Sequence, residues 1–149
     1  MSALHADATF LIRRAHQAAQ ALFGCACGDL DLTATQYSIL AVLHDRGRLS
    51  QNEIGRIAGI DRATTSLVVK ALRKRKLISA KRHGADRRKV MIRMTRSGRR
   101  AHDAGRVGAD RANRDLLSVL TESETAQFME ILGLIGRARI PADGGSSVD

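Results

Sequence analysis

Three successive helix-start signals constrain the fold more than any other feature of this sequence. Each begins with a residue that can cap a helix, and the first two carry Gln or Glu three positions later: Thr33–Gln36, Ser50–Glu53 and Asp61. Pairs with this spacing satisfy free backbone N–H groups reciprocally at a helix N-terminus. The signals predict helices over residues 34–46, 51–58 and 62–75. Gly47 and Gly59 supply the breaks between these helices.

The hydrophobic pattern changes after Leu77 from a helical period to that of strands. Residues 77–82 and 89–94 flank a tip rich in turn-forming residues, a pattern typical of a β-hairpin. Two short helices, a tight turn with glycine, a third helix and a basic hairpin together predict a winged helix-turn-helix.

Further helices are expected on both sides of this segment. Apolar stripes and capping residues place them over residues 7–23, 96–119 and 122–139. Gly24 and Gly28 would bracket the break after the first helix, and Pro141 would stop the last. Because Ala, Leu, Arg and Ile dominate the composition, helix is favoured over a sheet sandwich. The predicted fold class is mainly α with a small β-hairpin wing, plus terminal dimerisation helices.

Positive charge is concentrated in the middle of the chain. Residues 46–100 hold 18 Lys and Arg against three acids, a local net charge of +15, whereas the remaining residues have a net charge of −5. A segment this basic is expected to face a polyanion. Charge alone does not distinguish DNA from a membrane surface or an acidic protein, so the individual residues must decide.

The third predicted helix has one side suited to a core and one suited to a DNA groove. Residues at i, i+3, i+4 and i+7 are expected to face the core: Thr65, Val68, Val69 and Leu72. The other side is small, polar and cationic, and we expect contacts to DNA from Arg62, Ala63, Thr64, Ser66, Leu67, Lys70 and Lys74. Arginine can bind guanine, leucine a thymine methyl group and lysine a phosphate. The alternative is an ordinary solvated helix face, and the basic hairpin that follows argues against it.

The predicted wing continues the basic character. Its expected DNA contacts are Lys81, Arg82, Asp86, Arg87 and Arg88. An arginine at a hairpin tip can enter a narrow minor groove, where the negative potential is deepest. Asp86 would pair with one arginine and orient the other outward, or it is simply a turn residue.

Residues 32–99 resemble the core of the MarR family of bacterial transcriptional regulators. The resemblance rests on the opening LTATQ, the block LSQNEIGRIAGIDRATTSLVVKAL and the wing DRRKVMIRMTRSGR. It implies a symmetric dimer that binds a pseudo-palindromic double-stranded operator and represses transcription until a small ligand, often a phenolic or aromatic acid, releases it. Asp86 and Arg88 fall on the family's wing motif. Leu67 departs from the pattern, because many members carry a charged residue there.

Dimerisation is also expected from the terminal helices. Their apolar stripes are either ordinary core or a surface shared with a second copy, and a two-fold protein matches a two-fold operator. We therefore divide the chain into a dimerisation region (1–31 and 97–140), a winged helix-turn-helix domain that binds DNA (32–96) and a disordered tail (141–149).

The first helix offers a candidate effector site. Arg13, His16 and Gln17 lie on a mainly apolar segment, where a ring can pack on the wall and a carboxylate can meet a cation. By resemblance, the family's pocket lies between the first helices and the DNA-binding lobe, which adds Tyr37. The expected ligand is a small aromatic carboxylate or phenol. The alternative is that these residues are structural.

Other functions have weaker support. Cys25 and Cys27 could sense peroxide as thiols, although they fit small buried residues in a turn better.

The five histidines show no metal-ligand spacing with the cysteines, so no metal and no cofactor are expected. No phosphate loop, nucleophile elbow or paired carboxylates indicate catalysis. With no apolar run of ~18–20 residues and no signal peptide, no membrane contact is expected. Two closely spaced cysteines are too few for a secreted disulfide framework, so a reducing cytoplasm is the expected location.

The rival class is a basic architectural or RNA-binding module that responds to no ligand. The chain contains no Trp, one Tyr and three Phe. Binding of single strands depends on aromatic side chains that stack on bases. This composition therefore favours a reader of duplex DNA.

Overall fold

The predicted caps begin the helices of the winged helix-turn-helix. In the computed structural model, which describes residues 6–82 and 90–137, these helices are α2 (Ala34–Arg46), α3 (Gln51–Ala58) and α4 (Arg62–Lys74). The Thr33 hydroxyl accepts a hydrogen bond from the Gln36 amide at 3.1 Å, and the Gln36 side chain accepts one from the Thr33 amide at 3.1 Å. The capping box at Ser50 forms in the same way. Local side-chain chemistry therefore positions both helix starts.

The hairpin consists of β1 (Ile78–Arg82) and β2 (Val90–Met94), which pair antiparallel. A third segment joins them, because Leu49 exchanges both backbone hydrogen bonds with Ile92, at 3.1 and 2.8 Å. This bridge ties the connection between α2 and α3 to the base of the wing. The two helices and the wing are thus held as one body.

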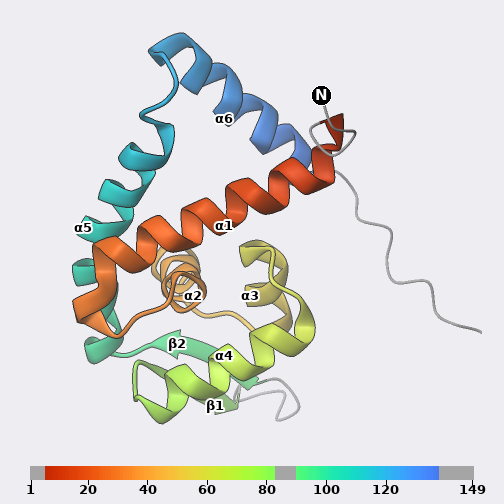
Figure 1. Cartoon of the computed structure of the whole chain (residues 1–149). Coiled ribbons are helices and arrows are strands. Elements are labelled where there is room, and N and C mark those ends of the chain that lie inside the picture. Colours follow the sequence, from red (N-terminus) through yellow and green to blue (C-terminus); the bar gives the residue numbers. More distant parts are fainter. Residues whose placement is uncertain (1–5, 83–89, 138–149) are drawn as a thin grey trace, which may run out of the picture. The chain divides into compact units, whose positions relative to one another are not determined.

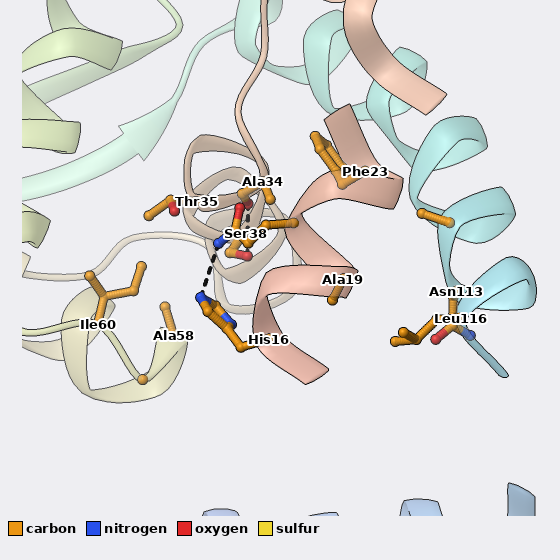
Figure 2. A pocket seen from close by; sticks show the side chains of 13 residues that line it. His16, Ala19, Phe23, Ala34, Thr35, Ser38, Ala58, Ile60, Asn113 and Leu116 are labelled. Carbon is orange, nitrogen blue, oxygen red and sulfur yellow. Dashed lines mark hydrogen bonds between the residues drawn. The ribbon is translucent and has the colours of Figure 1, made fainter. Parts of the chain in front are cut away.

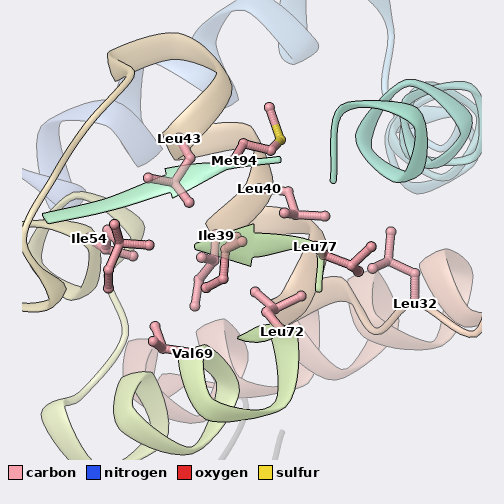
Figure 3. Close-up of a cluster of buried hydrophobic side chains, with 11 residues drawn as sticks. Leu32, Ile39, Leu40, Leu43, Ile54, Val69, Leu72, Leu77 and Met94 are labelled. Carbon is pink, nitrogen blue, oxygen red and sulfur yellow. The ribbon is translucent and has the colours of Figure 1, made fainter. Parts of the chain in front are cut away.

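One apolar core lies under these elements (Figure 3). Its fully buried side chains come from α2, α3 and α4: Ile39, Leu40, Ile54 and Leu72. The hairpin adds Ile78, Ile92 and Met94. Figure 1 shows α2 passing between α1 on one side and the layer of α4 and the hairpin on the other. The core therefore fixes the orientation of α4, the element predicted to meet DNA.

A close approach between α3 and α4 makes the helix-turn-helix tight. A Cβ atom added at Gly55 would lie 2.7 Å from the Thr65 hydroxyl, so only glycine fits at this crossing. The buried Thr65 hydroxyl donates a hydrogen bond to the Asp61 carbonyl at 2.7 Å. Gly59 ends α3 with a φ of 66°, the left-handed region that glycine adopts readily.

The first helix is longer than predicted. α1 spans Ala8–Cys27 and runs through Gly24, and a short 3₁₀ turn, η2 (Gly28–Leu30), follows it. The predicted break at Gly24 is therefore wrong. Cys27 is buried against α5 and packs with Phe23 and Ala112. Burial at this end outweighs the cost of about 0.5–1 kcal/mol for one glycine inside a helix.

The next helix is α5 (Arg96–Leu117), which ends two residues before the predicted position and lies in the first compact unit except for Leu117. The molecule has two such units, residues 1–116 and 117–149. In the second unit, α6 (Glu122–Gly136) begins at a capping box between Thr121 and Glu124, as predicted. The predicted end of this helix at 139 and the predicted tail, 141–149, lie outside the described residues. No helix in the described ranges is both long and apolar enough to span a membrane.

Candidate nucleic-acid interface and effector pocket

The side of α4 predicted to meet DNA is exposed. Arg62, Ala63, Ser66, Leu67, Lys70 and Lys74 are all solvent-exposed, and Thr64 is half-buried. Leu67 leaves 70% of its surface open to solvent, whereas Thr65, Val69 and Leu72 on the opposite side are at most 4% exposed. The orientation predicted from the helical period is confirmed. That these side chains contact DNA remains a prediction.

The cations on this face are not held by acids. Within the described residues, no carboxylate oxygen lies within 4.0 Å of Arg62, Lys70 or Lys74. Asp61 instead accepts the Thr64 amide at 2.8 Å as the helix cap. The side-chain and backbone hydrogen bonds from Thr64 lower the pKa of Asp61 below its ordinary value. The charge of these three cations is therefore available to an anionic partner.

Arg75, near the end of α4, has a different role. Its guanidinium donates to the Asp31 carbonyl at 2.6 Å and to the Gln36 side chain at 3.3 Å. These bonds tie the end of α4 to the segment before α2. The structure thus separates a structural arginine from the unpaired cations on the outer face.

Only the base of the predicted wing interface can be placed. Lys81 and Arg82 are exposed at the end of β1. The other predicted wing contacts, Asp86, Arg87 and Arg88, lie outside the described residues.

A pocket of about 330 Å³ opens between α1, α2, the turn after α3, and α5 (Figure 2). Its walls are mainly apolar, and the large apolar side chains among them are Phe23, Ile60 and Leu116. Polar side chains enter it from three helices: His16, Gln20, Thr35, Ser38 and Asn113. All of these residues belong to the first compact unit. An apolar wall with a few polar groups is typical of a site for a small molecule.

Hydrogen bonds inside the pocket define what it can offer a ligand. His16 Nε2 lies 3.2 Å from the Gln20 amide nitrogen, the bond that Figure 2 marks at the histidine. The Ser38 hydroxyl donates to the Ala34 carbonyl at 3.0 Å. His16 is the one ionisable side chain among the residues that line the pocket. An acidic ligand would therefore meet the imidazole here rather than a guanidinium.

The structure brings one of the four predicted ligand contacts into this pocket. His16 lines it, whereas Arg13, Gln17 and Tyr37 are absent from its wall. The helical period explains the difference on α1, because the pocket face repeats at i, i+3, i+4 and i+7: His16, Ala19, Gln20 and Phe23. Gln17 lies off this face, and Arg13 lies one turn before it. Roles for these three residues stay a prediction.

Tyr37 belongs to a stack of rings that sequence reasoning missed. Its ring lies parallel to the buried His102 ring at a centroid distance of 5.6 Å, and His44 stacks on His102 at 4.3 Å. Burial is the main cause that raises the pKa of Tyr37. Residues 37, 44 and 102 have no spacing that signals this contact, because packing of α2 on α5 creates it.

The same stack bears on metal binding. His44, His102 and Asp103 place their potential ligand atoms within 4.8 Å of one another, and His102 Nδ1 lies 3.0 Å from the Asp103 carboxylate. A shared metal ion requires nitrogen lone pairs that converge on one point. The two imidazole rings are only 12° from parallel, so their in-plane lone pairs do not converge in this arrangement.

The two cysteines differ in their surroundings. Both lie in α1 instead of the predicted turn; Cys25 is exposed and Cys27 is buried. The Cys27 thiol donates to the Gly105 carbonyl at 3.7 Å, and burial raises its pKa. A raised pKa lowers the fraction of reactive thiolate. Residues two apart in a helix point to different sides, so this geometry does not favour a disulfide between them.

Known proteins share both the sequence pattern and the fold. A model of the MarR family matches residues 30–89. The HTH-type transcriptional repressor NicR of Pseudomonas putida is 36% identical over 94 residues, which cover 63% of this chain and 60% of NicR.

Two solved structures resemble the chain over nearly all of their own length. One is BpsR of Bordetella bronchiseptica, whose DNA binding is regulated by 6-hydroxynicotinic acid. It is 30% identical to this chain, with a TM-score of 0.83 over 89% of this chain and 95% of BpsR. PcaV from Streptomyces coelicolor, in complex with its natural ligand, is also 30% identical, with a TM-score of 0.80 over 91% of this chain and 95% of PcaV. The likeness thus includes the flanking helices as well as the winged helix-turn-helix, and this chain belongs to the MarR family of transcriptional regulators.

Proposed function

We propose that this protein is a homodimeric repressor that binds a pseudo-palindromic DNA operator and is released by a small aromatic acid. The observation that carries the proposal is the outer face of α4. It is exposed, and its cations have no carboxylate partner within the described residues. A helix of this kind fits the major groove, where side chains reach base edges and phosphates.

The individual positions suggest a division of labour. Arg62 lies at the first position of α4 and can bind guanine in a bidentate manner, while Lys70 and Lys74 lie about two and three turns further and suit phosphates. Leu67 offers an apolar contact to a thymine methyl group. Lys81 and Arg82 would extend the contact along the wing.

The pocket supplies the proposed effector site. A volume of about 330 Å³ suits a ligand with one or two rings, and Phe23 and Ile60 offer apolar walls for them. The His16 imidazole would donate a hydrogen bond to a carboxylate, and Ser38 and Asn113 would bind ring substituents. The relative BpsR, whose DNA binding is regulated by 6-hydroxynicotinic acid, supports a ligand of this class.

The location of the pocket suggests how release occurs. Its walls come from α1 and α5, in the predicted dimerisation region, and from α2 and the turn before α4, in the DNA-binding domain. Half-sites read by two recognition helices lie about one helical turn, ~34 Å, apart. A ligand bound between the two regions would alter the position of α4. The contacts of the two recognition helices with both half-sites would then be lost together.

The proposal is tested first by DNA binding. We expect the protein to prefer its promoter duplex over a random duplex by about 10³-fold or more in a gel-shift assay. Equal affinity for both duplexes would instead indicate an architectural DNA-binding protein and contradict the proposal.

The effector is tested by calorimetry with hydroxynicotinates, benzoates and cinnamates, and with aliphatic acids as controls. We expect an aromatic acid to bind and to weaken operator binding. His16→Phe should abolish release by the acid and leave operator affinity unchanged. Arg14→Ala, at an exposed position of α1 outside the pocket wall, is the control and should respond as the wild type does. Absence of binding by all three ligand classes would remove the aromatic-acid effector.

A further inference from the structure

A second pocket, of about 470 Å³, is lined by four arginines. Arg48 comes from the connection between α2 and α3, Arg93 from β2, and Arg96 and Arg99 from the first turn of α5. Ser79 of β1 and Thr95 complete the polar lining. We call this site the arginine pocket.

The arginine pocket lies on a different face of the molecule from the outer side of α4. Ser79 and Arg93 are directly opposite each other in the hairpin, so their side chains share one face of the two strands. The neighbouring pairs put Ile78 and Ile92 on the other face, in the core. Met94, opposite Ile78, belongs to the core and also lines the pocket. Contacts of α4 with a DNA groove therefore do not explain this cluster of cations.

The four guanidinium groups have no acidic partner within the described part of the chain. Arg93 Nε donates to a neutral group, the Ser79 hydroxyl, at 3.4 Å. Within the described residues, no carboxylate oxygen lies within 4.0 Å of any of the four arginines. The acid one turn after Arg99 is Asp103, and its carboxylate lies instead 3.0 Å from His102.

Arginines further along α5 show the opposite pattern. Arg106 and Arg111 each face an aspartate one turn later, Asp110 and Asp115, at 4.0 and 3.9 Å. The first turn of α5 contains no acid, so Arg96 and Arg99 also face the positive end of the helix dipole. Without nearby carboxylates among the described residues, and at the positive end of α5, the arginine pocket has uncompensated positive charge.

We propose that the arginine pocket binds a small multivalent oxyanion of the phosphate class, such as a polyphosphate or a phosphorylated metabolite. Guanidinium groups present paired N–H donors that match phosphate oxygens in a bidentate manner. An oxyanion held by several of them would relieve repulsion between the cations and complement the start of α5. This site is independent of the aromatic-acid pocket and of the operator contacts of α4.

The same phosphate chemistry is present in a free anion and in the backbone of flanking DNA. The test therefore measures both, with pyrophosphate as the probe for the free anion. Calorimetry of the full-length, DNA-free protein at fixed ionic strength compares the wild type with two double variants of equal charge. One is Arg96→Ser with Arg99→Ser, in the pocket; the control is Arg106→Ser with Arg111→Ser, on the same helix.

We expect saturable binding of pyrophosphate that weakens about tenfold or more in the pocket variant and changes little in the control. Arg48→Ser with Arg93→Ser tests the same pocket from other elements, should the α5 variant fail to fold. Equal affinity in the pocket and control variants would overturn the proposal, as would the absence of saturable binding. The pocket variant could instead keep its affinity for pyrophosphate, lose affinity for duplex DNA and show a weaker salt dependence of duplex binding. The arginines would then bind the DNA backbone, and the proposed site for a free anion would be wrong.

Discussion

At the scale of single residues, position on α4 decides what each cation can do. Arg62 begins the helix and Lys74 ends it, and both are exposed without a carboxylate within 4.0 Å in the described part of the chain. A bidentate arginine on a base edge carries sequence information, whereas a lysine on a phosphate does not. Arg75, only one residue beyond Lys74, is bonded to Asp31 and Gln36 instead.

The two ends of α4 should therefore respond differently to truncation. Arg62→Ala should cost about 1–3 kcal/mol on the preferred operator and relax specificity at one base step. Lys74→Ala should weaken all duplexes alike and reduce the salt slope by about one. Titrations of operator and base-substituted duplexes at several salt concentrations measure both effects. Identical behaviour of the two variants would show that Arg62 does not contact a base.

Two glycines, Gly108 of α5 and Gly24 of α1, form a second pair for comparison, because the first lies in the packing of α1 on α5 and the second is exposed. A Cβ atom at Gly108 would collide with Cys27 Sγ, whereas one at Gly24 would meet nothing within 4 Å. Gly108→Ala should destabilise the fold by about 1–3 kcal/mol through overpacking, and Gly24→Ala should stabilise it by up to about 1 kcal/mol. Denaturant unfolding checks the opposite signs, and a stable Gly108→Ala protein would contradict the close contact of α1 with α5.

At the scale of elements, three capping boxes and two aspartate caps set the starts of five helices. These starts are predictable because a cap is a contact between residues three apart, and both residues are visible in the sequence. Helix ends depend on more distant contacts. α1 runs past Gly24 because Cys27 is buried against α5, and residues that far along the chain give no local signal.

The cap of α4 should make stability depend on pH. Hydrogen bonds from Thr64 lower the pKa of folded Asp61 below 3.8, so the ionised cap stabilises the folded state above that pH. The contribution is lost as the pH falls through the folded pKa. Asp61→Ala should therefore lower Tm at neutral pH and have a smaller effect in strong acid. Asp61→Asn, which keeps the capping oxygen without the charge, is the control, and a pH-independent effect of Asp61→Ala would contradict the role of ionisation.

At the scale of the whole molecule, the exposed apolar side chains of α6 support the proposed dimer. α6 leaves a set of large apolar residues open to solvent: Met129, Ile131, Leu132, Leu134 and Ile135. Ile131 and Leu134 are 53% and 58% exposed and lie three residues apart on one side of the helix. A second copy would cover this surface and place two recognition helices on a two-fold operator.

If α6 forms the dimer interface, charged substitutions on its exposed apolar side should prevent dimerisation. Ile131→Glu with Leu134→Glu should give a monomer in analytical ultracentrifugation and weaken operator binding strongly, because each half-site would then bind alone. Leu67→Glu adds a charge at an exposed leucine of α4 and should remain dimeric while it impairs DNA binding. If the α6 variant remained a dimer, the dimer interface would lie elsewhere on the molecule.

The sequence by itself determined the starts of the helices, the presence of the hairpin and the outward face of α4. Each depends on hydrogen bonds or periodicity within a few residues. Only the tertiary structure decided which side chains line the two pockets, that Leu49 joins the wing, and that Tyr37, His102 and His44 stack. These features join residues distant in sequence, and packing of the shared core, rather than any local pattern, sets their distances.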